Sequence, residues 1–212
     1  MIQKALLHFA SFLLSKLSLN SVHSIGIFVG KIYFFFSKKN YKFLRDNIKN
    51  SKIFEHSIIE DAIIQNINEL GKGIIESFYI WGSSQEKSLN LVRNIIGEKY
   101  LINAEKRGKG IIFLTPHLGC FEITSIYYGS KKPITVMYRK ARKIWMSDFM
   151  INGRKKGNVK PVPADIKGLK KVLIALKNGE AVGILPDQVA DKGEGELANF
   201  FGRPAYTMVL IS

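Results

Sequence analysis

Apolar residues recur at spacings of three and four between residues 58 and 82, a pattern typical of an amphipathic helix that buries one face. The members of this stripe are Ile59, Ile63, Ile67, Leu70, Ile74, Phe78 and Trp81. We therefore predict one long helix in this part of the chain.

From residue 110 onward, short apolar runs replace the long stripe. They are "GIIFLT" at 110–115, "PITVMYR" at 133–139, "VKPVPA" at 159–164 and "AVGILPD" at 181–187. Between the last two runs, residues 165–180 carry an apolar helical face, and Asn178 and Gly179 predict where that helix ends. Short strands that alternate with helices indicate an α/β fold with a mostly parallel sheet and flanking helices.

In such a sheet, ligands bind beyond the carboxyl ends of the strands. We therefore expect functional side chains at residues 115–122, 138–142 and 186–191, which follow three of the predicted strands.

Residues 5–36 are apolar and aromatic, but polar residues interrupt them at short intervals. Since no stretch of about 18 apolar residues is unbroken, a clean transmembrane helix is not the first prediction. An interfacial hairpin or a tilted anchor is favoured, with basic residues that face anionic headgroups; these are Lys16, Lys31, Lys38 and Lys39. The alternative is two amphipathic helices packed on the core of the domain. The sequence thus predicts a membrane-associating helical segment at residues 1–37 and a single domain at residues 38–212.

The composition narrows the choice of partners. The 212 residues include 32 Lys and Arg against 17 Asp and Glu, a formal net charge of +15. This charge favours partners that carry phosphate or carboxylate, namely nucleic acid, anionic lipid or an acidic protein. Apolar residues make up 46% of the chain and the mean hydropathy is +0.03, which excludes both a disordered chain and a polytopic membrane protein.

The segment "TPHLGCFE" carries the first candidate chemistry, His117 and Glu122. On one helix, a separation of five residues would place the two side chains about 140° apart, so they could not meet. If His117 instead lies in the turn before the helix, Glu122 can accept the proton of one ring nitrogen and leave the other as a general base. The structural alternative is a turn histidine and a glutamate that is favoured by the helix dipole.

Two other uses of this segment are weaker hypotheses. The spacing of His117 and Glu122 is not that of a zinc-binding helix, and no third ligand is evident, so we expect neither a metal nor another cofactor. Cys120 is the single cysteine, which permits no internal disulfide. It is a possible nucleophile beside His117, although a small buried hydrophobe is the commoner role of a lone cysteine.

The second candidate is the basic segment at residues 138–160, with eight Lys or Arg against one acidic residue, Asp148. Arg139 follows a predicted strand and Arg154 follows a predicted helix, so either can enter the crevice and grip a phosphate in a bidentate way. A solvated face is the better interpretation for the lysines Lys140, Lys143, Lys155 and Lys156. No helix-turn-helix, zinc-finger or RNP signature is present, so we do not expect nucleic-acid binding.

The third candidate is Asp187, which follows Pro186 at the end of the last predicted strand. It can hold Arg139 or Arg154, or bind substrate. We predict that an acidic, Gly-rich loop follows it. The acidic residues of this region do not match a calcium-loop spacing.

Taken together, the segments "TPHLGCFE", "YRKARK", "GRKKGN", "KGLKKVLIALKNGEAVGILPDQ" and "FFGRPAYT" resemble the late acyltransferases of lipid A biosynthesis, in the lysophospholipid acyltransferase superfamily. The resemblance implies a glycerolipid-acyltransferase-like fold and covers nearly the whole chain. Members of the family continue further than this chain, which ends on the apolar run "RPAYTMVLIS", so we expect the domain to be truncated at its C-terminus.

The resemblance also implies an activity and roles for the candidates. A fatty acyl chain passes from acyl carrier protein to a hydroxyl of a lipid A precursor, at the cytoplasmic face of the bacterial inner membrane. His117 and Glu122 match the catalytic pair, Arg139 and Arg154 match functional arginines, and Asp187 lies in the Pro-Asp motif. Two alternatives stay open: another glycolipid or lysophospholipid acceptor, and a non-catalytic basic protein that binds membrane or nucleic acid.

Overall fold

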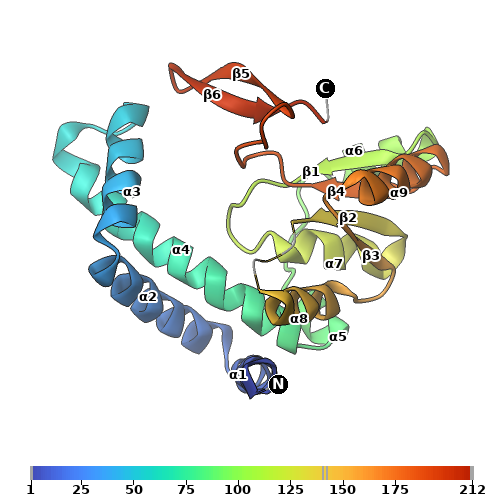
Figure 1. The fold of residues 1–212 in the computed structure, drawn as a ribbon. Helices are drawn as coiled ribbons and strands as arrows, with labels where there is room; N and C mark the ends of the chain where they lie inside the picture. The colour runs from blue at the N-terminus through green and yellow to red at the C-terminus, as the bar shows by residue number, and fades with distance from the viewer. Residues whose placement is uncertain (1, 140, 142, 211–212) are drawn as a thin grey trace. The chain divides into compact units, whose positions relative to one another are not determined.

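The computed structural model of the protein describes residues 2–139, 141 and 143–210 (Figure 1). The chain folds into two compact units. The first is formed by Met1–Leu17 and Ser77–Leu185, and the second by Ser18–Glu76 and Pro186–Ser212.

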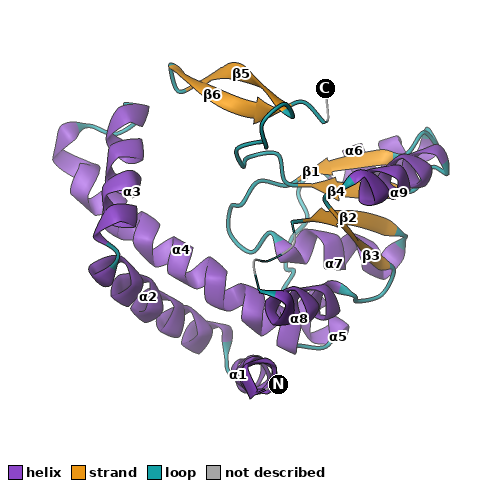
Figure 2. Cartoon of the chain, viewed as in Figure 1, coloured by secondary structure: helices purple, strands orange, loops and turns teal. Residues whose placement is uncertain are grey.

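A four-stranded parallel sheet forms the centre of the first unit, as predicted. Its strands are β1 (Ile111–Leu114), β2 (Ile134–Tyr138), β3 (Val159–Pro163) and β4 (Ala181–Ile184). They are arranged in the order β1-β4-β2-β3, and every neighbouring pair is parallel (Figure 2). Each strand falls within one of the four apolar runs of the sequence, so the prediction of an α/β fold with a parallel sheet is confirmed.

Apolar side chains of the flanking helices pack against both faces of this sheet. On one face, Tyr128 of α7 (Glu122–Lys131) packs with Ile134, Val159 and Ala181, and α6 (Glu98–Lys106) adds Leu101. On the other face, α9 contributes Val172 and Ala175, which pack with two strand valines, Val162 and Val182. Helices on both faces explain why the strands read as continuous apolar runs in the sequence.

The helix α9 (Ile166–Lys177) begins and ends where its sequence predicts. Its N-cap residue Asp165 accepts a hydrogen bond from the Gly168 amide at 2.9 Å. Asn178 is the C-cap, and Gly179 follows with a φ of 74°, a conformation that glycine adopts without strain.

The edge strand β3 contains two prolines, Pro161 and Pro163. At its ends, the Asn158 carbonyl accepts from the Ile134 amide and the Ala164 amide donates to the Tyr138 carbonyl. In a parallel ladder, alternate residues bond to the same neighbour, so residues 160, 162 and 164 face β2. The two prolines therefore lie where the missing N–H would point away from the sheet, the position in which an edge strand tolerates them.

Helices α1 (Ile2–Lys16), α5 (Gln85–Leu89) and α8 (Ile144–Arg154) belong to the same unit. The Ser11 hydroxyl of α1 donates to the Phe78 carbonyl of α4 (Ile59–Gly82). A Cβ at Gly82 would lie 2.3 Å from the Ser11 carbonyl oxygen, so α1 and the end of α4 cross in close contact. The ring of Phe149 in α8 stacks on Phe78, with 5.7 Å between the ring centroids. These contacts fix α8, which carries Arg154.

The second unit contains α2 (Leu19–Phe36), α3 (Lys38–Ser51), the short 3-10 helix η1 (His56–Ile58) and most of α4. The bounds of α4 confirm the long helix predicted from the apolar stripe. Three glycines allow α2 and α4 to approach each other: a Cβ at Gly71 would lie 2.1 Å from the Gly26 oxygen and 3.0 Å from the Gly30 Cα. Small residues spaced by four positions are a common means of close helix packing.

By length and composition, α2 is the one helix of the described residues that is apolar enough to cross a membrane. Its mean hydropathy is 1.3, and 17% of it is buried within the protein. Its outward side carries large apolar side chains, with Phe28 exposed by 64%, Phe35 by 77% and Phe36 by 78%. The association of residues 1–37 with a membrane stays a prediction, to which this exposed apolar surface gives support.

The prediction of an acidic loop throughout the region after Asp187 is wrong for its second half. Residues Gly195–Phe200 (β5) and Arg203–Met208 (β6) form an antiparallel hairpin. The two turn residues between them, Phe201 and Gly202, have φ of 50° and 72°. Positive φ at both positions is the requirement of a two-residue type I′ turn. A phenylalanine rarely occupies the first position, so this hairpin is hard to predict from the residue types of its turn.

Candidate functional site

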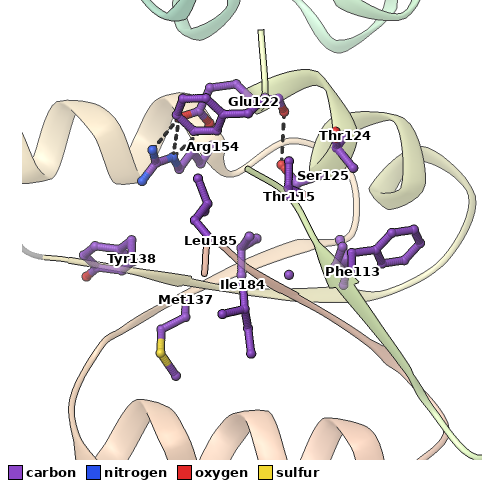
Figure 3. Close-up of a pocket in the computed structure, with 14 residues that line it drawn as sticks. Phe113, Thr115, Glu122, Thr124, Ser125, Met137, Tyr138, Arg154, Ile184 and Leu185 are labelled. Carbon is purple, nitrogen blue, oxygen red and sulfur yellow. Dashed lines mark hydrogen bonds and ion pairs between the residues drawn. The ribbon is translucent and has the colours of Figure 1, made fainter. Parts of the chain in front are cut away.

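A small cavity lies at the carboxyl ends of β1, β2 and β4 (Figure 3). It measures about 30 Å³, which is enough for one or two water molecules. Its walls include Thr115, Glu122, Tyr138, Arg154 and Leu185. Two of the three predicted segments, 115–122 and 138–142, thus contribute to the cavity; residues 140 and 142 of the latter lie outside the described residues. The third segment, 186–191, belongs to the second unit.

His117 lies in the turn between β1 and α7 and is exposed, whereas α7 begins at Glu122. The condition set by the sequence for this pair, a histidine outside the helix and a glutamate inside it, is therefore met. The His117 ring packs edge-on against Phe121, with 4.8 Å between the ring centroids. Gly119 has a φ of 55°, and no atom lies within 4 Å of the position that its Cβ would take, so the backbone of this turn is open to a ligand.

Arg154 holds the carboxylate of Glu122 in the cavity. Its Nε donates to Oε1 at 3.0 Å and to Oε2 at 2.9 Å, and its Nη2 also donates to Oε1. The Glu122 side chain is 2% exposed and that of Arg154 13%, so water screens this ion pair weakly. Figure 3 shows the Arg154 side chain directed at Glu122.

Two helix termini favour this pair. Glu122 is in the first turn of α7, where the helix dipole stabilises a negative charge. Arg154 is in the last turn of α8, where the dipole stabilises a positive charge. A buried ion pair contributes little net stability compared with apolar residues of the same volume. The pair at the strand ends is therefore a candidate functional pair.

Trp81 supports Arg154 from α4. The guanidinium carbon of Arg154 lies 5.5 Å from the centroid of the Trp81 ring, a cation–π contact. The neighbouring residue in α8 must be glycine, because a Cβ at Gly153 would lie 2.4 Å from the Trp81 Cβ. The ring restricts the movement of the guanidinium and so supports its bidentate contact with Glu122.

Lys156 is not part of a solvated face, so the prediction for this lysine is wrong. Its ammonium donates to the carbonyls of Ile80 and Ser83, the latter at 2.7 Å. These carbonyls lie at the C-terminal end of α4, where helical acceptors lack partners and a cation is favoured. Burial lowers the pKa of Lys156 to about 8, against the smaller opposite effect of the charge on Glu122.

The lowered pKa of Lys156 predicts a pH dependence of stability. Between the folded value of about 8 and the ordinary value of 10.5, the unfolded chain holds a proton that the folded chain lacks. The free energy of unfolding therefore gains a contribution that rises with pH through this window and is constant below it. We expect the difference in unfolding free energy, wild type minus Lys156→Met, to increase from pH 8 to pH 10 in urea titrations. Parallel curves for the two proteins would contradict the buried state of Lys156.

The remaining candidates have varied environments. Arg139 is exposed directly after β2, and Asp187 lies in the second unit, so the predictions that they bind substrate stay untested. Cys120 is partly buried in the turn before α7. Lys143 and Lys155 are exposed, as expected of a solvated face, and Lys140 lies outside the described residues.

Trp81 and Lys156 are the site residues that sequence reasoning missed. Trp81 belonged to the apolar stripe of the long helix. That pattern does not distinguish a tryptophan of the core from one that contacts an arginine. Lys156 lies in a run of basic residues, and the sequence does not show which of them is buried. A partial signal existed for both, since Gly153 and Gly157 flank the segment "RKK" and permit close packing there.

Comparison with known proteins identifies the family. Residues 3–212 match the family described as Bacterial lipid A biosynthesis acyltransferase. The chain belongs to this family. The resemblance inferred from the ordered motifs is thereby confirmed.

Three curated proteins of Escherichia coli and Shigella flexneri are similar to this chain. The chain is 22% identical over 169 residues to the Escherichia coli K12 lipid A biosynthesis lauroyltransferase, over 78% of this chain and 54% of the relative. It is 25% identical over 142 residues to the palmitoleoyltransferase of the same organism, over 67% of this chain and 45% of the relative. A Shigella flexneri lipid A biosynthesis acyltransferase matches to the same extent. The chain thus spans about half the length of these relatives.

Proposed function

We propose that the protein transfers a fatty acyl chain from acyl carrier protein to a hydroxyl of a lipid A precursor. The observation that carries this proposal is the buried Glu122–Arg154 pair at the strand ends, beside the open turn of His117, in a chain of the lipid A acyltransferase family. A charged pair that is costly to bury favours a catalytic role over a structural one.

His117 acts as the general base. Its unprotonated ring nitrogen takes the proton of the acceptor hydroxyl while the oxygen attacks the thioester carbonyl. The tetrahedral intermediate collapses, the carbon–sulfur bond breaks, and the imidazolium returns the proton to the leaving thiolate. The products are an ester and the free thiol, and no acyl-enzyme forms.

Glu122 orients His117 and stabilises the imidazolium. A carboxylate has about four lone-pair directions, so the contacts with Arg154 leave capacity for a ring N–H of the histidine. In this proposal Arg154 keeps Glu122 ionised and fixes its orientation. Its remaining N–H donors, together with Arg139, are directed at the acceptor phosphate or at the thioester oxygen, and Asp187 contributes to substrate binding.

The oxyanion requires hydrogen-bond donors at the position where charge develops. The backbone amides after Gly119, at the start of α7, are suitable because they lie on the positive end of the helix dipole. Arg139 and Arg154 are the alternative donors.

The net charge of the chain and the surface of α2 are consistent with the proposed partners. The net charge of +15 favours both an acidic carrier protein and an anionic glycolipid, and it accelerates their encounter more than it tightens their binding. The exposed apolar side of α2 supports contact with a membrane, which we place at the cytoplasmic face of the bacterial inner membrane.

The assay that tests the proposal supplies the full-length protein with an acyl carrier protein thioester and a tetra-acylated lipid A precursor. We expect one additional ester-linked acyl chain on the precursor, detected by mass spectrometry. Parallel reactions with a lysophospholipid or another glycolipid test the rival acceptors. Binding of these lipids without any product, weakened steeply by salt, would instead indicate a non-catalytic basic protein.

A further inference from the structure

A second hollow is formed by residues of α2, α3 and α4 in the second unit. This groove has a volume of about 660 Å³, within the range of small-molecule sites. Its walls are Lys31, Phe34, Phe35, Lys38, Tyr41, Ile64, Ile67 and Asn68. We call it the helical groove.

The charge along the helical groove is positive. Lys31 and Lys38 are exposed, and none of the eight wall residues is acidic. Neither lysine takes part in an ion pair within the part of the chain that the structure describes. The helix α3 also begins here, and its N-cap Ser37 makes no capping hydrogen bond through its side chain. The two lysines line the same groove, so its charge favours an anionic group such as a phosphate over a neutral one.

Asn68 adds a separate requirement. Its Oδ1 is buried and lacks a hydrogen-bond partner within the described chain. A buried acceptor without a donor is costly, and native proteins keep few of them. Because Oδ1 accepts and cannot donate, it repels a phosphate oxygen and requires an O–H or N–H group.

The rest of the wall is apolar. Phe34, Ile64 and Ile67 line the helical groove, and Phe35 is 77% exposed beside them. The groove thus has two lysines, a buried acceptor and an apolar wall. An occupant that matches all three carries a phosphate, a hydrogen-bond donor near it and a hydrocarbon chain. A second copy of this protein does not fit, since it would bring two more lysines to a basic groove.

We propose that the helical groove binds an anionic glycerophospholipid with a hydroxyl-bearing headgroup, of which phosphatidylglycerol is the simplest. Lys31 and Lys38 bind its phosphate, Asn68 accepts a hydrogen bond from a headgroup hydroxyl, and the aromatic wall contacts the first part of an acyl chain. This site is independent of acyl transfer, so its test does not require an active enzyme.

Binding of the full-length protein to vesicles tests the proposal. The vesicles contain phosphatidylcholine alone, or phosphatidylcholine with either phosphatidylglycerol or phosphatidic acid, which carries a phosphate without the headgroup hydroxyls. We expect the phosphatidylglycerol vesicles to bind most tightly. Lys31→Ala/Lys38→Ala should weaken that binding about tenfold or more. The matched control Lys42→Ala/Lys52→Ala removes the same charge from exposed positions outside the groove and should leave most of the binding intact.

Asn68→Leu separates a binding role from a structural one. This substitution removes the unpaired acceptor, so the thermal midpoint of the free protein should stay or rise while binding of phosphatidylglycerol weakens. Two outcomes would show that only general surface charge matters and would overturn the proposal. The first is an equal loss of binding in the two double lysine variants. The second is equal binding of phosphatidylglycerol and phosphatidic acid, with no change in Asn68→Leu. A stable dimer that excludes lipid, and that Lys31→Ala/Lys38→Ala strengthens, would also overturn it.

Discussion

Replacing Arg154 by alanine is expected to lower the free energy of unfolding by about 3 kcal/mol, because it leaves the Glu122 carboxylate buried without its partner. The value lies at the low end of the range for broken buried pairs, since Lys156 still supplies a positive charge that Glu122 senses. Urea unfolding of the wild type and the variant measures the difference.

Two further variants make this prediction specific. Removal of both partners in Glu122→Ala/Arg154→Ala should cost less than the sum of the single substitutions, since neither charge is then left alone. The exposed pair Lys160–Glu180 is the matched control, because Lys160→Ala should cost no more than about 1 kcal/mol. Equal costs for Arg154→Ala and Lys160→Ala would show that the buried Glu122 carboxylate does not depend on Arg154 as its partner.

Replacing His117 by alanine is expected to reduce kcat by about 10³-fold, the usual contribution of a general base. The fold should be unaffected, because His117 is exposed in a turn. Single-turnover measurements of acyl transfer by the full-length protein, with circular dichroism of the same samples, separate the chemical step from folding.

A histidine elsewhere in the chain serves as the control for this experiment. His56 is exposed in η1, outside the cavity at the strand ends, and His56→Ala should retain wild-type kcat. If His117→Ala transferred the acyl chain as fast as His56→Ala, His117 would not be the base, and the proposed mechanism would fail with it.

The strands of the sheet and the helix α9 were predictable because neighbouring residues in the sequence determine them. Each strand falls in a short, mostly apolar run, and Asp165, Asn178 and Gly179 mark the ends of α9 with residue types that favour helix termini. The hairpin of β5 and β6 was not, since its turn places Phe201 in a backbone conformation that phenylalanine rarely adopts.

The location of the candidate site and some of the residues that form it follow from the sequence. The parallel sheet placed the candidates at the strand ends, and His117 and Glu122 followed from one motif. The pairing of Glu122 with Arg154 spans 32 residues and depends on how α8 packs, which no local pattern encodes. The same is true of Lys156, whose partners Ile80 and Ser83, at and just after the end of α4, lie more than 70 residues away.

The two prolines of β3 determine which edge of the sheet can pair with a further strand. Without outward N–H groups at residues 161 and 163, this border cannot template another strand, whereas β1 at the opposite border carries no proline. Ile112 and Leu114 of β1 are 45% and 53% exposed, so the side chains beside that border are apolar and partly exposed. Recombinant handling of the chain should therefore protect β1, because it is the place where separate molecules would pair and precipitate.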